Sequence, residues 1–171
     1  MTHYDDNLVR AIRRHSINKL KKLLAEGAYP EQLSSFGENP LFLAVREDEK
    51  EIVEIFLPLV DLKCKNTDGM NVLHVASLIS RGNMVKILLQ YIDPKIDNEG
   101  ATSLHYAAMQ GCDDIVEMLL PLVNPTTKDK YDNTPLDYAE KYDRIKIIEM
   151  INEQIEKNKN KRVIDLFTLL V

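Results

Sequence analysis

The stretch Gly100-Ala-Thr-Ser-Leu-His-Tyr-Ala-Ala-Met-Gln-Gly-Cys-Asp-Asp-Ile-Val-Glu-Met-Leu-Leu120 decides the fold of this chain of 171 residues. Its first half places Leu104 and Ala107 on one face of a short helix. After a polar turn, its second half carries apolar residues whose spacings of one, three and four define one stripe of an amphipathic helix: Ile115, Val116, Leu119 and Leu120. The stretch therefore predicts a short helix, a tight turn and a longer helix.

The same Leu and Ala pair recurs along the whole chain. It stands at Leu8 and Ala11, Leu41 and Ala44, Leu73 and Ala76, Leu104 and Ala107, and Leu136 and Ala139. The leucines are separated by 33, 32, 31 and 32 residues. An apolar stripe follows each of the later pairs, and one unit alone cannot bury such a stripe. The sequence therefore predicts an all-α stack of helix–turn–helix units.

Helix starts and connector turns are marked in each unit. The predicted starts carry a side-chain acceptor or a first-turn proline, and they are Asn39-Pro40, Asn71, Thr102-Ser103 and Thr134-Pro135. Two residues earlier stand Gly37, Gly69, Gly100 and, in the last unit, Asp132. These residue types suit a tight turn with positive φ.

With its partial copies Asn39-Pro-Leu-Phe42, Asn71-Val-Leu-His74 and Thr134-Pro-Leu136, the opening stretch resembles the ankyrin repeat. The resemblance implies an ankyrin-repeat solenoid with short hairpin-like connectors within residues 1–155. The five repeats would span about residues 5–36, 37–67, 68–98, 99–130 and 131–155. The family's glycine after the second helix is present as Gly27. Residues that resist positive φ replace it at Val60, Ile92 and Val123, so these helices are expected to end without a glycine cap.

Residues 156–171 are first basic and then apolar. A terminal repeat exposes an apolar flank that needs a cover, so the segment is predicted to form a capping helix folded back onto the fifth repeat. The alternative is a helical ligand that docks in a partner or in a second copy of the chain.

Composition excludes several classes of function. The formal charge of −5 gives no electrostatic case for nucleic acid. The longest apolar runs are about eight residues, well short of the ~18 that a membrane span needs. The first residues resemble no signal peptide, and Cys64 and Cys112 lack partners at metal-ligand spacing. We therefore expect an intracellular, cytoplasmic protein with free thiols, with a nuclear location left open.

No motif in the sequence predicts catalysis, and no cofactor is implied. A nucleophile elbow and a glycine-rich phosphate loop are both missing. His74 and His105 lie one repeat apart, which could suggest a metal pair, but no further ligand completes a site. Both fall on the histidine of the Thr-Pro-Leu-His box that the sequence resembles, where the imidazole has a structural role. We therefore predict a non-enzyme.

The resemblance implies that a partner protein binds the concave face, with the chain acting as a scaffold or an inhibitor. Positions of that face carry apolar, aromatic and charged side chains, and the predicted partner-binding residues are Phe36, Arg46, Met70, Leu78, Ile79, Met109, Gln110, Tyr131, Lys141 and Tyr142. Exposed apolar and aromatic side chains are typical of interface centres. The alternative interpretation of Leu78 and Ile79 is packing between neighbouring repeats.

Two other functions remain open from the sequence. Tyr131, Tyr142 and Lys141 could form a stacking and charge site in a regulator that binds nucleotides or other small ligands. The apolar C-terminal tail could instead join the chain, as a structural subunit, to a larger assembly or to a second copy. Otherwise a monomer is expected.

Overall fold

The computed structural model describes residues 6–31 and 33–169, and this part of the chain is all-helical apart from one isolated bridge between Ile96 and Thr102. Its helices are α1 Asp6–Arg13, α2 Ile17–Ala25, α3 Pro40–Arg46, α4 Lys50–Phe56, α5 Val72–Leu78, α6 Gly82–Leu88, α7 Ser103–Gln110, α8 Asp113–Leu119, α9 Pro135–Lys141 and α10 Ile145–Leu169. The chain divides into two compact units, residues 1–93 and 94–171. The predicted fold class, an all-α repeat solenoid, is confirmed.

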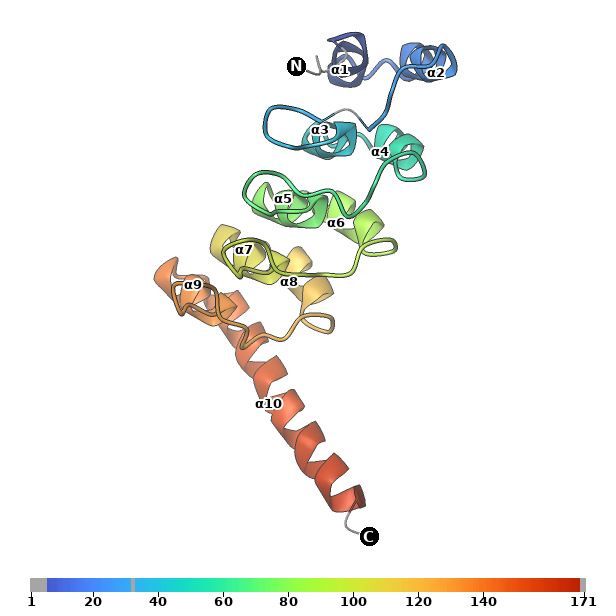
Figure 1. Ribbon diagram of the computed structural model, residues 1–171. Coiled ribbons are helices and arrows are strands. Elements are labelled where there is room, and N and C mark those ends of the chain that lie inside the picture. The colour runs from blue at the N-terminus through green and yellow to red at the C-terminus, as the bar shows by residue number, and fades with distance from the viewer. Residues whose placement is uncertain (1–5, 32, 170–171) are drawn as a thin grey trace. The chain divides into compact units, whose positions relative to one another are not determined.

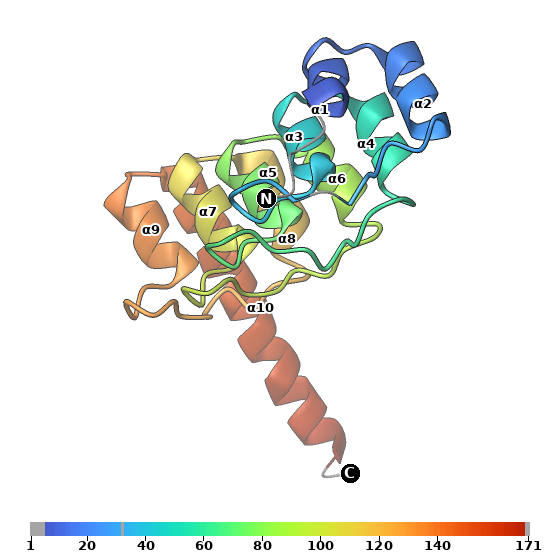
Figure 2. The same cartoon turned by 45° about the horizontal axis from the view of Figure 1, so that its top comes forward.

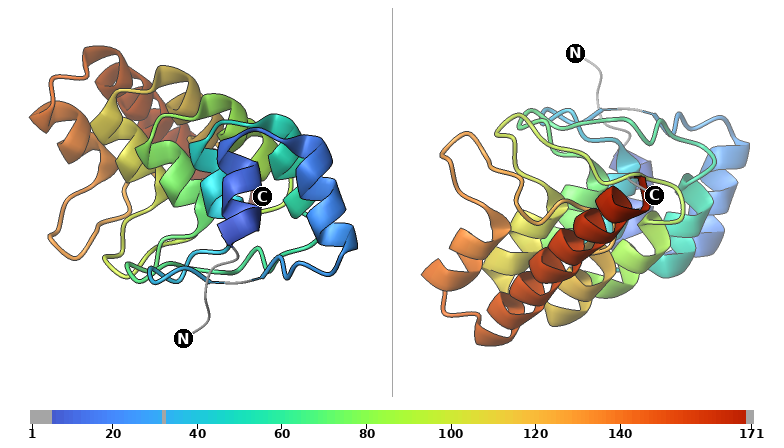
Figure 3. Two further views of the ribbon diagram at one scale, coloured as in Figure 1. Left: turned by 90° about the horizontal axis from the view of Figure 1, so that it is seen from above. Right: turned by 90° about the horizontal axis from the view of Figure 1, so that it is seen from below.

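The N-terminal unit contains three helix pairs. The first helices α1, α3 and α5 stack in one row and the second helices α2, α4 and α6 form another (Figure 1). The connectors that follow α2 and α4 run beside each other at one end of the helices (Figures 2 and 3). The C-terminal unit repeats the plan with the pairs α7/α8 and α9/α10, in which α7 packs on α9 and α8 packs on α10. Each unit therefore presents a row of first helices next to the turns of its connectors. We call these turns the connector tips; they are residues 34–38, 66–70, 97–101 and 129–133.

The recurring Leu and Ala pairs form the core of the first-helix rows. We call these pairs the frame and their leucines the frame leucines. Its members are at most 1% exposed at Leu8, Ala11, Leu41, Ala44, Leu73, Ala76, Leu104, Ala107 and Ala139. Leu136 alone is half-buried, in the last of these helices. The second-helix stripes are buried as well, with Ile52, Val85 and Ile115 each 0% exposed. Alanine at the contact lets neighbouring first helices approach closely, while the larger side chains fill the space between the two rows.

The predicted helix starts are confirmed. Asn39, Asn71, Thr102 and Thr134 are the N-caps of α3, α5, α7 and α9. The Asn71 side-chain oxygen, for example, accepts hydrogen bonds from the backbone N–H groups of Leu73 and His74. Each cap satisfies a backbone donor that the first helical turn leaves without an intrahelical partner.

The turn between the two helices of each repeat uses a left-handed residue seven positions after the frame leucine. These residues are His15, Asp48, Ser80, Gly111 and Asp143, with φ values of 51°, 60°, 60°, 83° and 53°. Only one of the five is glycine, the residue that adopts this conformation without steric cost. At Gly111 the side chain of Arg144 lies close to the backbone and donates hydrogen bonds to the carbonyl oxygen of Met109 at 3.3 and 3.4 Å.

The unusual ends of the second helices are also as predicted. Val60, Ile92 and Val123 are each 8% exposed and do not take positive φ. The N–H groups of Ile92 and Val123 donate to the carbonyl oxygens four residues earlier, at 2.9 Å in both cases. These helices therefore end in a right-handed turn that buries a β-branched side chain, whereas Gly27 keeps the left-handed end with φ of 93°.

The last helix differs from the prediction of a separate capping helix for residues 156–171. Helix α10 is continuous over 25 residues and crosses the expected boundary at residue 155 (Figure 1). The reason is local: residues 152–162 contain no glycine or proline, and pairs such as Glu153 with Lys157 join successive turns. Ile164 is 64% exposed. The side chains at 162, 163 and 165–169 and residues 170–171 lie outside the described part, so most of the apolar tail stays a prediction.

Removing the distal part of α10 is expected to leave the fold nearly as stable as before. Ile151 is the last buried residue of α10 among those whose side chains are described. A chain that ends at Asn158 should therefore lose less than about 1 kcal/mol of unfolding free energy, which is the contribution of a few exposed ion pairs on a helix surface. Urea unfolding followed by circular dichroism measures this. A loss of several kcal/mol would show that the tail covers the repeats.

Candidate functional site

Each connector tip is held by one side-chain oxygen. Ser34, Asn66, Asp97 and Asp129 occupy the same position, seven residues before the frame leucine. In each, the side-chain oxygen accepts hydrogen bonds from the backbone N–H groups two and four residues later, at 2.8–3.2 Å. The third residue after each of these takes positive φ, as predicted, with φ of 76° at Gly37 and 69° at Asp132. The tips are thus fixed frames for the side chains that they carry.

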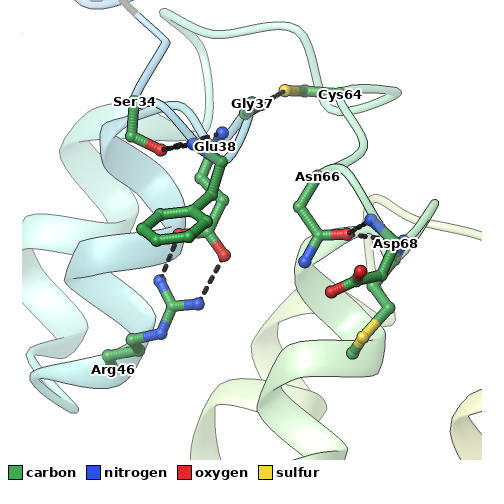
Figure 4. Close-up of polar contacts among 9 residues, drawn as sticks. Ser34, Gly37, Glu38, Arg46, Cys64, Asn66 and Asp68 are labelled. Carbon is green, nitrogen blue, oxygen red and sulfur yellow. Dashed lines mark hydrogen bonds and ion pairs between the residues drawn. The ribbon is translucent and has the colours of Figure 1, made fainter.

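The N-terminal unit has a hollow of about 500 Å³ between its connector tips and first helices. Its lining comes from α1, α3 and two tips: Val9, Arg13, Ser34, Ser35, Phe36, Glu38, Leu43, Arg46, Asn66, Thr67 and Asp68. Figure 4 shows Ser34 and Glu38 on one side of this region and Asn66 and Asp68 on the other. Phe36 is 65% exposed, so a large aromatic surface lies at the hollow without covering from this chain.

An ion pair joins two of the residues that line this hollow, Glu38 and Arg46. The two terminal guanidinium nitrogens of Arg46, Nη1 and Nη2, each donate to one carboxylate oxygen of Glu38 (Figure 4). The Glu38 side chain is only 9% exposed, whereas that of Arg46 is 39% exposed. A two-point pair of this kind fixes both side chains more firmly than a single contact between exposed charges. Arg46, a predicted partner-binding residue, therefore already neutralises a buried carboxylate.

The C-terminal unit has a second hollow, of about 250 Å³. It is lined by Glu99, Ala101, His105, Tyr106, Met109, Asp129, Tyr131 and Tyr138. Two of its tyrosine hydroxyls donate to connector-tip carboxylates: Tyr106 to Asp97 at 2.5 Å and Tyr138 to Asp129 at 2.7 Å. Tyr131 is 64% exposed. The hollow is therefore aromatic and acidic, and hydrogen bonds hold two of its three tyrosine rings in place.

The charges around the second hollow are well defined. Burial alone would raise the pKa of Asp129, but hydrogen bonds from Tyr138, Asn133 and Tyr131 outweigh it and lower that pKa. Burial and the bond to Asp129 raise the pKa of Tyr138 to about 12. The proton therefore stays on the tyrosine and the charge on the carboxylate. At the rim, Lys130 pairs with Glu99 and lowers the pKa of the Glu99 carboxyl.

Both predicted structural histidines are buried in helix caps. His74 Nδ1 accepts from the backbone N–H of Asn71 at 3.2 Å, and His105 Nδ1 accepts from that of Thr102 at 2.9 Å. His105 Nε2 also lies 3.2 Å from the carbonyl oxygen of Asn133, which is 28 residues away. Within the C-terminal unit this ring therefore joins the start of α7 to the next connector.

Nine of the ten predicted partner-binding residues, all but Met70, divide into four groups. Phe36 and Arg46 line the first hollow, and Met109 and Tyr131 line the second. Gln110, Lys141 and Tyr142 are exposed at or just after the ends of α7 and α9, and they do not belong to the lining of the second hollow. Leu78 and Ile79 are half-buried at the end of α5.

The prediction that Met70 is exposed is wrong. Met70 is 6% exposed, so its side chain is buried, and its backbone N–H donates to the side-chain oxygen of Asn66 at 2.9 Å. The nucleotide-site alternative stays a prediction: Tyr131 lines the second hollow, Tyr142 is exposed outside its lining, and each has its own lysine over the ring. Lys130 lies 5.0 Å from the Tyr131 ring centre and Lys141 lies 5.7 Å from that of Tyr142.

Four residues at the second hollow were not predicted from the sequence as functional: Asp97, Tyr106, Asp129 and Tyr138. A signal for them was present, because the tyrosine follows the aspartate by nine residues in both repeats, and the two pairs lie 32 residues apart. Such a pair, repeated in register, indicates that the two side chains meet.

In the described part of the chain, no group of three or more His, Cys, Asp or Glu side chains could hold a metal ion. None of the helices there combines the length and the apolar character of a membrane span. Burial raises the pKa of the Cys64 thiol, whose Sγ donates to the carbonyl oxygen of Gly37 at 3.2 Å (Figure 4). A thiol with a raised pKa is a poor nucleophile at neutral pH.

A stack of frame leucines, capped first helices and rigid connector tips defines a repeat protein that presents side chains on a fixed scaffold. The family described as ankyrin repeats in three copies matches residues 8–98, 58–129 and 83–162, and the chain belongs to this family. Ankyrin repeats are general protein–protein interaction modules, and the family is typically non-catalytic.

Curated relatives carry the same repeats within much longer chains. The human transient receptor potential cation channel subfamily A member 1 is 31% identical over 142 residues, covering 78% of this chain and 13% of the channel. The mitochondrial disaggregase of Bos taurus is 25% identical over 172 aligned residues, covering 92% of this chain and 24% of the disaggregase. Human neurogenic locus notch homolog protein 2 is 30% identical over 127 residues, covering 72% of this chain and 5% of that protein. The chain thus spans less than a quarter of the length of these relatives.

Proposed function

We propose that this chain binds a partner protein through its connector tips and first helices, as a scaffold or an inhibitor, with one contact centre at each hollow. The observation that carries the proposal is an exposed aromatic ring on a fixed tip beside each hollow, Phe36 in one unit and Tyr131 in the other. Aromatic anchors next to pockets contribute most of the binding energy in protein interfaces. A fixed tip also lowers the entropy lost when a partner orders that side chain.

The test is partner capture with charge-introducing variants. The double variant Phe36→Glu/Tyr131→Glu should weaken binding of the captured partner by roughly 30-fold or more, because it puts an unpaired charge at two anchor positions. Affinity capture with cross-linking mass spectrometry identifies the partner, and titration with that purified partner gives the affinity. The cross-links should fall on the tips and the first helices.

A matched control uses apolar side chains of similar exposure elsewhere in each unit. Tyr91 and Leu122 are each 56% exposed and follow the second helices α6 and α8. The variant Tyr91→Glu/Leu122→Glu should bind the partner as the unchanged chain does. Undiminished binding by a folded Phe36→Glu/Tyr131→Glu chain would contradict the proposal, as would cross-links confined to the second helices.

A further inference from the structure

Three tyrosine rings and a thioether meet at the second hollow. Tyr106, Tyr131, Tyr138 and Met109 all line it. The hydroxyls of Tyr106 and Tyr138 are already donated to Asp97 and Asp129, so what these two residues offer a ligand is the aromatic ring. A phenol that donates to a carboxylate gains electron density, which strengthens the negative potential over the ring face. Such a lining attracts a cation more than it attracts a neutral apolar group.

The charges around this hollow also favour a cation. Its lining contains two carboxylates, Glu99 and Asp129, and neither lysine nor arginine. Asp97, behind Tyr106, adds a third, and Asp97 and Asp129 are only 6% and 7% exposed. Salt screens buried charges less than exposed ones, so these carboxylates hold a negative potential over the hollow. Lys130 forms an ion pair with one of these carboxylates, that of Glu99.

Lys130 already shows how a cation sits at the rim. Its Nζ lies 5.0 Å from the centre of the Tyr131 ring and pairs with the Glu99 carboxylate. The lysine side chain is 48% exposed, so it can swing away into solvent. A flexible, half-exposed side chain makes a weak bond that a better-placed cation can displace. The chain's own ammonium group therefore stands where a ligand's would.

We propose that the second hollow takes a lysine or arginine side chain of the partner protein, which displaces Lys130 from Tyr131 and Glu99. This inference rests on the proposed function and adds the chemistry of one contact. The stem of the incoming side chain would lie along the rings and Met109, while its charged end meets the rim. Because the Asp129 oxygens already accept three hydrogen bonds, that carboxylate would attract the cation through its field more than through a direct bond.

The experiment compares two blocked tripeptides on the full chain. Acetyl-Gly-Lys-Gly-amide and its norleucine counterpart share the same stem and differ in the ammonium group. Titrated into the isotopically labelled chain, the lysine peptide should shift the backbone amide signals of Ala101, Met109 and Tyr131 saturably, and the norleucine peptide should not. Tyr131→Leu and Glu99→Gln should each weaken the lysine peptide by roughly two- to fivefold, and Lys130→Met should strengthen it by a similar factor.

Tyr91→Leu is the matched control, because Tyr91 is also an exposed tyrosine, at 56%, and it lies outside the hollow. It should leave the peptide affinity unchanged. The inference is overturned if neither peptide gives saturable shifts, if norleucine works as well as lysine, or if Tyr131→Leu binds as the unchanged chain does. If the peptide titration gives one of these results but Phe36→Glu/Tyr131→Glu still loses partner binding, the proposed function holds and only the lysine or arginine contact is wrong.

Discussion

Replacing His105 with alanine is expected to lower the free energy of unfolding by roughly 3 kcal/mol. The ring is 2% exposed, and its removal leaves a buried cavity. It also leaves the backbone N–H of Thr102 and the carbonyl oxygen of Asn133 without the partner that the imidazole provides. An edge-to-face contact with Tyr138, with ring centres 6.0 Å apart, is lost as well. Urea unfolding at neutral pH measures the difference.

A neutral acceptor should restore part of this loss. In the last repeat Asp137 stands at the equivalent position and accepts from the backbone N–H of Thr134 at 2.6 Å. The variant His105→Asn can make the same cap, and it should recover about 1 kcal/mol relative to alanine. His15→Ala, at an exposed histidine, serves as the control and should change stability by less than about 0.5 kcal/mol. Equal stability of the His105→Ala and unchanged chains would contradict the assigned role.

The same residue gives the chain a pH dependence of known sign. Burial lowers the pKa of His105 below its ordinary value of 6.5, although hydrogen bonds and nearby carboxylates oppose this. The unfolded chain therefore binds a proton more readily than the folded one. The stability contributed by the neutral ring is present above about pH 6.5 and is lost as the pH falls through the folded pKa. His105→Asn should show a smaller loss of stability than the unchanged chain between about pH 7 and pH 5.

Gly111 and Ser80 occupy the same left-handed turn position, and substitutions there are expected to have opposite effects. A Cβ at Gly111 would lie 2.8 Å from Nε and 2.9 Å from Cζ of Arg144. The arginine would have to give up its bonds to the Met109 carbonyl, and alanine would carry the cost of positive φ. Gly111→Ala should therefore destabilise the chain by roughly 2 kcal/mol.

Ser80→Gly removes a Cβ from a residue with φ of 60° and should raise the unfolding free energy by about 0.5–1 kcal/mol. Ser80→Ala keeps the Cβ and is the matched control, with no more than a small change expected. Thermal unfolding of the three variants beside the unchanged chain measures the order. A stable Gly111→Ala chain would mean that Arg144 finds another position at no cost.

Much of the fold could be predicted because its causes are local and repeated. The Leu104 and Ala107 frame, the caps at Asn71 and Thr102, and the turn glycine at Gly100 each depend on neighbours within a few residues. Each feature also recurs at the same position of several repeats, so its presence in one repeat supports its prediction in the next. The missing glycine caps could be predicted for the same reason, since β-branched residues such as Val60 and Val123 exclude positive φ at any single position.

What the sequence could not supply was the direction of individual side chains at the tips. Met70 and Phe36 both stand beside a turn glycine, yet one is buried and the other is 65% exposed. The pair of Glu38 with Arg46 spans eight residues, from just before the N-cap of α3 to the last residue of that helix, beyond the reach of helical spacing rules. The change of composition after residue 155 predicts a boundary there, but the residue types around Lys157 still favour a helix, and α10 continues to Leu169.

The tips separate the residues that hold the scaffold from those that a partner would meet. At Phe36, Asp68, Glu99 and Tyr131, the backbone N–H donates to the side-chain oxygen that fixes the tip, and the residue's own side chain takes no part in that bond. Exchange of these side chains leaves the holding bonds intact. Such an arrangement lets mutation change what the surface recognises at little cost in stability, so new specificities can evolve, or be engineered, one tip at a time.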